Sequence, residues 1–219
     1  MWVALAAAIG IGLAVGAING GIISIFKVQP FIVTLALLLA SRGAALNLSH
    51  NANVSVEYAT NYKDLWKTEI GPVPLPVVIV IVAYVLGSIM LNLTRFGRHI
   101  LAIGGNEEAA RLAGLPINRT LFFVYLLSGA LAGLAGALLA AQGNTGSPTA
   151  AVGWELTAIA AVVVGGTLLT GGRGSVWTTL VGVVLLGLIF NELNFERGKG
   201  IFDITQYWEE VIRGLFLLI

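Results

Sequence analysis

Residues 95–119 read RFGRHILAIGGNEEAARLAGLPINR, a polar stretch that separates two long apolar parts of the chain. Its centre has the pattern of a short helix with defined ends. Asn106 is a favourable N-cap because its side-chain oxygen can accept a first-turn backbone N–H. Glu107 and Glu108 then place negative charge at the positive end of the helix dipole, and Gly114 supplies the carboxyl-terminal stop. A helix this short is not stable alone in water, so we expect it to dock on a partner outside the membrane.

The composition indicates a polytopic α-helical membrane protein. Hydrophobic residues make up 57% of the chain and charged residues 11%, whereas a soluble globular chain carries about 25% charged residues. Several apolar runs reach the about 20 residues that a helix needs to cross a hydrocarbon core. They are apolar throughout rather than alternating, which disfavours a β-barrel. A net charge of +1 gives no indication of a nucleic-acid partner, and the lack of cysteine excludes disulfides and thiolate metal sites.

We therefore expect an all-α transmembrane helical bundle of about six to seven spans, forming one domain over residues 1–219. The run 156–170 is short, which leaves open a re-entrant or broken helix there. The chain begins and ends inside apolar stretches, so we expect it to be truncated at both ends. The predicted spans are 2–26, 30–48, 77–94, 120–142, 156–170, 176–192 and 207–219.

The distribution of basic residues predicts the orientation of these spans. Arginine recurs four times in 95–119, whereas the polar segment 49–76 has two lysines. The positive-inside rule places the arginine-rich segment in the cytoplasm and 49–76 outside. Alternation then puts the amino terminus and the short segment 143–154 outside as well.

No pattern for covalent chemistry or metal binding is present. The sequence has two histidines, and no Ser/His/Asp or His/Asp/Glu set that the predicted topology would bring together. The glycine-rich turn 170–175 (TGGRGS) lacks the lysine and spacing of a P-loop, so we predict no nucleotide site there. Paired carboxylates in mid-span, which an ion-coupled carrier often needs, are missing. We predict no catalytic, cofactor or metal site in this chain, and expect the energy for any uphill transport to come from elsewhere.

Polar residues within the apolar runs are candidates for a substrate path. Arg42 lies inside 30–48, where it is either an interfacial anchor or part of a pathway or helix contact. Glu155 precedes 156–170, where capping of the helix is the first interpretation and a place at the mouth of a path the second. The candidate path residues are Asn19, Ser41, Arg42, Asn47 and Glu155.

Glycines recur at helical spacing in two of the predicted spans. Gly12, Gly16 and Gly20 share one face of the first span, and Gly129 and Gly133 form a GxxxG pattern in the fourth. Small residues at this spacing let two helices approach closely. We interpret both faces as helix-packing surfaces.

Five stretches in a fixed order give the chain a family resemblance. They are NGGIISIFKVQPFIVTLALLLASRGAAL (19–46), TRFGRHILAIGGNEEAARLAGLPINR (94–119), YLLSGALAGLAGALLAA (125–141), GWELTAIAAVVVGGTLLTGGRGSVWTTLVG (153–182) and YWEEVIRG (207–214). In this order and spacing the sequence resembles the permease subunits of bacterial ABC sugar importers of the ribose/xylose/galactose type. The polar segment 49–76 carries no role from that resemblance.

The resemblance implies an inner-membrane permease that catalyses nothing covalent itself. Residues 95–119 would be a cytoplasmic coupling loop, similar to the EAA-type loop through which such permeases engage their ATPase subunits. Its ATPase-coupling residues would be Asn106, Glu107, Glu108, Ala109, Ala110, Arg111 and Gly114.

Implied partners are two cytoplasmic ATP-binding-cassette subunits, a second permease and a periplasmic sugar-binding protein. ATP is then used by the partner and not bound by this chain. Three alternatives remain open: another cargo (a branched-chain amino acid or a signalling furanose), a stand-alone carrier or channel, and a membrane scaffold that does not transport.

Overall fold

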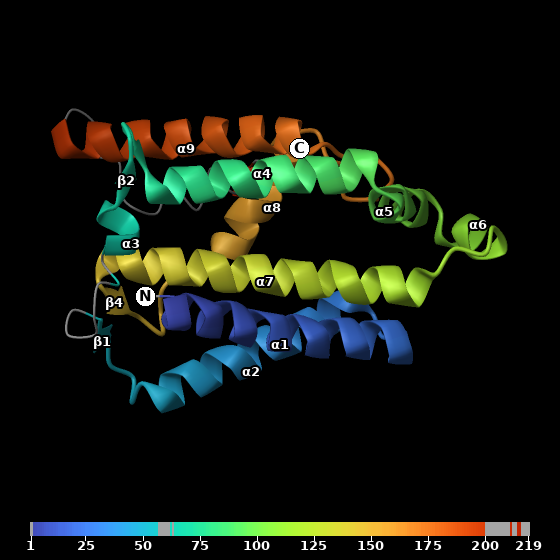
Figure 1. Cartoon of the computed structure of the whole chain (residues 1–219), viewed down its shortest axis with the longest axis horizontal. Coiled ribbons are helices and arrows are strands. Elements are labelled where there is room, and N and C mark those ends of the chain that lie inside the picture. Colours follow the sequence, from blue (N-terminus) through green and yellow to red (C-terminus); the bar gives the residue numbers. More distant parts are fainter. Residues whose placement is uncertain (1, 57–61, 63, 200–210, 212–213, 216–219) are drawn as a thin grey trace. The chain divides into compact units, whose positions relative to one another are not determined.

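The computed structural model describes residues 2–56, 62, 64–199, 211 and 214–215, and it is dominated by α-helices (Figure 1). The chain divides into two compact units. The first comprises Met1–Ala83 and Arg111–Ala150, and the second Tyr84–Ala110 and Ala151–Ile219. The expected all-α class is confirmed.

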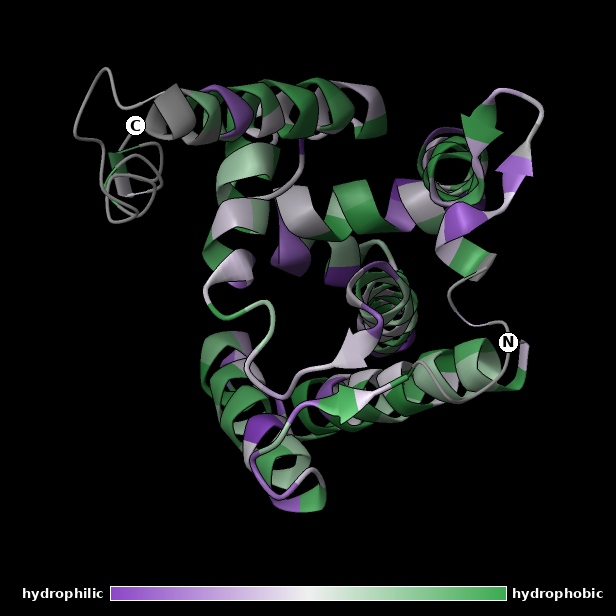
Figure 2. Ribbon diagram, turned by 90° about the vertical axis from the view of Figure 1, so that its left-hand side faces the viewer, coloured by the Kyte–Doolittle hydropathy of each residue, from purple (hydrophilic) through white to green (hydrophobic). Residues whose placement is uncertain are grey.

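Within the described residues, five helices are long and apolar enough to cross a membrane. They match the predicted spans within a few residues, except at the carboxyl end of α9. Large apolar side chains are exposed along them, as expected for helices that face lipid, and hydrophobic residues recur on the helices in Figure 2. The predicted span 207–219 lies outside the described residues except for 211, 214 and 215. The five helices are α1 (Trp2–Phe26), α2 (Pro30–Leu48), α4 (Leu75–Leu93), α7 (Ile117–Gly143) and α9 (Val176–Lys199).

The prediction of a continuous span over 156–170 is wrong, and the broken-helix alternative agrees with the structure. Helix α8 (Trp154–Val164) has 11 residues and is about 16 Å long, whereas the hydrocarbon core is about 30 Å thick. It ends because Gly165 and Gly166 follow, and Gly166 adopts a φ of +80° that a helix cannot continue. The apolar run continues to Leu169. A prediction from hydropathy therefore extends the span past Gly166, because hydropathy carries no information on backbone conformation.

The two predicted glycine faces pack against each other in the first unit. A Cβ on Gly16 would come within 2.5 Å of the Tyr125 carbonyl oxygen, and one on Gly20 within 2.9 Å of the Phe122 carbonyl oxygen. Gly12 makes the same kind of contact with Gly129. As the residue number rises along α1, the number of the contacting residue on α7 falls, so the two helices are antiparallel, with their backbones in contact.

The segments that precede α4 and follow α7 are joined in the first unit. Strand β1 (Val54–Ser55) pairs antiparallel with β4 (Thr145–Gly146), and β2 (Glu69–Ile70) pairs with β3 (Val73–Pro74). The β1–β4 pair joins Val54–Ser55 to Thr145–Gly146, and the side of the membrane on which the pair lies stays a prediction.

A short helix also anchors this segment on α7. In the residues around α3 (Asp64–Lys67), Leu65 is 1% exposed, and the Tyr62 hydroxyl donates a hydrogen bond of 2.8 Å to the Ala137 carbonyl. Tyr62 is thus buried against α7. Burial raises the pKa of its phenol above the ordinary value.

In the second unit, α8 packs antiparallel on the first half of α9. A Cβ on Gly165 would lie 2.7 Å from the Thr178 carbonyl oxygen, and Gly182 meets the Ala161 carbonyl from the other side. Ala160 and Ala161 form a buried cluster with Leu186. Close backbone contact therefore fixes the end of α8 on the start of α9.

Candidate functional site

The polar stretch 95–119 contains two helices, α5 (Arg95–Gly105) and α6 (Glu107–Leu112), before α7 begins. Thr94 caps α5, because its Oγ1 accepts the Gly97 N–H at 3.1 Å. Sequence reasoning predicted α6 but missed α5. The signal was available: a Thr N-cap followed by charged and apolar residues at helical spacing, the pattern of an amphipathic helix.

Helix α6 has the ends that the sequence predicts. The Asn106 Oδ1 accepts the Ala109 N–H at 2.9 Å, and Gly114 adopts a φ of +75°. Asn106 is also the C-cap of α5, since its own N–H donates to the Ala102 carbonyl at 3.1 Å. One residue therefore terminates α5 and caps α6, so hydrogen bonds tie the two helices together at their junction.

Most of the predicted coupling residues are exposed. Asn106, Glu107, Glu108, Ala109, Arg111 and Gly114 all lie at the surface of the described structure, whereas Ala110 is buried. Leu112, which ends α6, was not among the predicted residues. It is 88% exposed, the highest value among the exposed large hydrophobic residues of the described chain. Its apolar surface is therefore available for burial by a partner.

The glycine-rich segment 165–175 contacts α5 beside this junction. A Cβ on Gly104 would lie 2.8 Å from the Gly172 nitrogen, and one on Gly172 would lie 2.7 Å from the Gly105 Cα. A Cβ on Gly171, whose φ is +89°, would clash with the Gly104 carbonyl oxygen. The glycine-rich segment therefore packs directly against α5.

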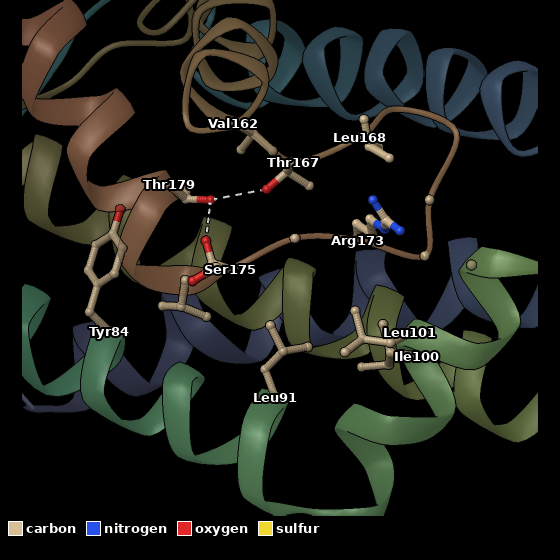
Figure 3. Close-up of a pocket in the computed structure, with 15 residues that line it drawn as sticks. Tyr84, Leu91, Ile100, Leu101, Val162, Thr167, Leu168, Arg173, Ser175 and Thr179 are labelled. Carbon is tan, nitrogen blue, oxygen red and sulfur yellow. Dashed lines mark hydrogen bonds between the residues drawn. The ribbon is translucent and has the colours of Figure 1, made fainter.

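A cavity of about 370 Å³ lies between this segment, α4 and α5 (Figure 3). Leu91, Ile100 and Leu101 form an apolar wall. Opposite them, the Thr179 Oγ1 donates a hydrogen bond of 2.9 Å to the Ser175 carbonyl and lies 3.5 Å from the Thr167 Oγ1. These hydroxyls thus have partners within the segment, and they stabilise its return into α9.

The structure does not join the five predicted path residues into one site. Ser41 and Asn47 are exposed on α2, Arg42 is half-buried, and Glu155 is exposed in the first turn of α8. The Glu155 position fits its capping interpretation. Asn19 lies on α1, and its Oδ1 is buried without a hydrogen-bond partner among the described residues. No hydrogen bond between described residues links any two of the five, so their role in a path stays a prediction.

Within the described part of the chain, no group of three or more His, Asp or Glu side chains could hold a metal ion. What the site offers is mechanical: an exposed, capped helix connected through one residue to a helix on which a glycine-rich segment packs.

Comparison with known proteins adds a family and its members. The family described as "Branched-chain amino acid transport system / permease component" matches residues 1–219. The chain is 39% identical to the ribose import permease protein RbsC of Escherichia coli K12, over 99% of this chain and 67% of that protein. It is 36% identical to the L-arabinose transport system permease protein AraH of the same strain, over 100% of this chain and 64% of that protein.

A third relative is the RbsC protein of Bacillus subtilis strain 168, at 38% identity over 92% of this chain and 61% of that protein. The chain thus spans roughly two thirds of the length of these relatives. No solved structure matches it.

Proposed function

Because the chain belongs to the permease family of branched-chain amino acid and related transport systems, we propose that it is the membrane-spanning part of an ATP-driven importer whose cargo is a monosaccharide. One observation carries this proposal: relatives named as ribose and L-arabinose permeases share 36–39% identity with nearly the whole chain. The five long apolar helices support a transmembrane location, which in bacteria would be the inner membrane.

The cargo is proposed to be neutral and rich in hydroxyl groups. Each candidate span has an 18-residue apolar window with at most two charged residues. Such spans suit a neutral sugar better than an amino acid, because a zwitterion has two opposite charges that the protein would have to compensate inside the membrane. The family description favours a second candidate, a branched-chain amino acid. We rank it below the sugar because the individual relatives carry sugar names.

The source of energy is proposed to be a pair of separate ATPase subunits that bind α6. Exposed Glu107, Glu108, Arg111 and Leu112 would provide the contact surface, and Asn106 and Gly114 would fix the ends of the helix. Further proposed partners are a second permease subunit and a periplasmic binding protein. Alternation between inward and outward states then requires that the ATPase bind the two states with different affinity.

Uptake by the reconstituted complex tests this function. The full-length permease, its ATPase and its binding protein are placed in proteoliposomes, and uptake of radiolabelled D-ribose, L-arabinose and L-leucine is measured with and without ATP. Sugar uptake that needs ATP and the ATPase supports the proposal. Leucine uptake alone would favour the second candidate, and uptake by the permease without ATPase would contradict an ATP-driven mechanism.

A further inference from the structure

The glycine contact between α5 and the segment after α8 has a geometry suited to passing on movement. Three glycines, Gly104, Gly171 and Gly172, bring two backbones together without an intervening side chain. A side chain at such a contact can change rotamer and absorb a small displacement, but a backbone-to-backbone contact cannot. Displacement of α5 toward this segment must therefore move the segment.

The contact is connected firmly to α6 on one side. Asn106 is hydrogen-bonded to both helices. Its N–H donates to the Ala102 carbonyl of α5 at 3.1 Å, and its carbonyl accepts the Ala110 N–H of α6 at 3.0 Å. The side-chain bond to Ala109 is a third connection. Gly104 lies two residues before this junction, so a push on α6 reaches it through hydrogen-bonded backbone.

On its other side, the contact is connected to α8 and α9. The Gly166 N–H donates to the Val163 carbonyl at 2.7 Å and the Thr167 N–H to Val162 at 3.1 Å, which ties the segment to the last turn of α8. The Leu168 N–H donates to the Arg173 carbonyl at 3.1 Å and closes the turn that carries Gly171 and Gly172. Close packing of Gly165 on Thr178 fixes the same end of α8 to α9.

We propose that the contact of Gly104 with Gly171 and Gly172 is a transmission point through which displacement of α6 moves the broken helix α8. The inference rests on the proposed function, because it takes α6 as the helix that an ATPase pushes. It adds the path by which displacement would pass from α6 to α8, and it assigns Gly104, Gly171 and Gly172 as positioning residues. Helix α8 is the element moved because it is short and interrupted, whereas the other apolar helices are continuous.

A reporter on α8 provides a test that does not depend on the cargo. These 219 residues contain no cysteine, so Leu156→Cys, at a position 47% exposed in the first turn of α8, is the one labelling site among them, and any cysteine elsewhere in the full-length permease or in the ATPase is first replaced by serine. The full-length permease carrying an environment-sensitive fluorophore there is assembled with its ATPase in nanodiscs. The change in fluorescence on adding ATP with vanadate is then recorded.

Two neighbouring glycines give a matched pair of variants. Gly104→Ala forces a methyl group to 2.8 Å from the Gly172 nitrogen. The segment is therefore already displaced from α5 in the resting variant, before any nucleotide is added. Gly105→Ala places its methyl group at an ordinary 3.7 Å from the Gly172 Cα. Both residues lie in α5, so both substitutions change helix propensity alike. We expect the reporter response to be lost in Gly104→Ala and retained in Gly105→Ala.

A third variant covers the case in which Gly104→Ala does not assemble, as judged by size-exclusion chromatography. One glycine inserted between Gly166 and Thr167 adds slack between the contact and α8 without adding a side chain, and it should also abolish the response. No response in the parent complex, or equal responses in the parent, Gly104→Ala and the insertion variant, would overturn the inference. Failure of the parent to take up ribose or arabinose would instead count against the proposed cargo and leave the reporter result decisive.

Discussion

Truncation of Leu112 is the most direct test of α6 as a docking helix. Leu→Ala removes three carbons, each worth about 0.8 kcal/mol when buried, so complete burial by a partner would give a loss of about 2.4 kcal/mol. Leu112 is 88% exposed in the permease alone, so nearly all of this burial is still available to a partner. Allowing for partial burial, we expect a loss of about 1–2 kcal/mol, which weakens binding roughly 5- to 30-fold. Alanine is the better helix former, so α6 itself is not weakened.

The assay is a titration of the ATPase subunit onto permease in nanodiscs, with Kd read from fluorescence anisotropy. Leu48→Ala is the matched control: Leu48 is also the last residue of its helix and is 83% exposed, but it adjoins the segment predicted to be outside. Its Kd should equal that of the parent. An unchanged Kd for Leu112→Ala, or an equal rise in Kd for both variants, would refute the docking argument.

Three further predictions concern α6, the α1–α7 contact and Tyr62. Asn106→Ala removes the bond to the Ala109 N–H and should cost α6 about 1 kcal/mol, measured as a several-fold weaker Kd in the same titration. Gly16→Ala forces a Cβ to 2.5 Å from the Tyr125 carbonyl and should lower stability by about 1–3 kcal/mol relative to Gly21→Ala, where nothing lies within 4 Å; equal thermal midpoints in detergent would contradict this. Burial raises the pKa of Tyr62 above 10.0, so its contribution to stability is complete below about pH 10 and is lost as pH rises through the folded-state pKa. Tyr62→Phe lacks the hydrogen bond to the Ala137 carbonyl and should be less stable than the parent at pH 8. Because the variant has no phenol to ionise at this position, denaturation measured from pH 8 to 11 should show a smaller fall in stability than in the parent.

The fold class and most element boundaries were predictable because their signals are local. Membrane spans depend on runs of apolar residues, and helix α6 depends on a cap and a glycine stop a few residues apart. The glycine faces of α1 and α7 could also be recognised, since spacing of four residues places them on one side of a helix. The EAA-like segment placed the candidate coupling residues. Their contact with an ATPase remains a prediction.

The break after Val164, the connection of Tyr62 to Ala137 and the contact of Gly104 with Gly172 were not predictable in the same way. The Tyr62 and Gly104 contacts depend on residues that meet only after the chain has folded, whereas the break after Val164 coincides with the adjacent Gly165 and Gly166. The run 156–170 contains enough apolar residues for a short span, and its hydropathy gives no weight to the positive φ of Gly166. The TGGRGS turn could be recognised as glycine-rich. The sequence does not show, however, that Gly171 and Gly172 lie against the backbone of Gly104 and Gly105 in α5, where a Cβ would clash.

By itself, the sequence determined that this chain enters a membrane as helices, and that one polar segment carries a short helix with fixed ends. Both follow from the cost of unpaired backbone groups in lipid and from capping, which act over a few residues. Tertiary structure alone decided which glycines touch and which part of the chain the segment after α8 packs against. Those outcomes depend on backbones packing at van der Waals distance, and neither composition nor spacing specifies the partner in such a contact.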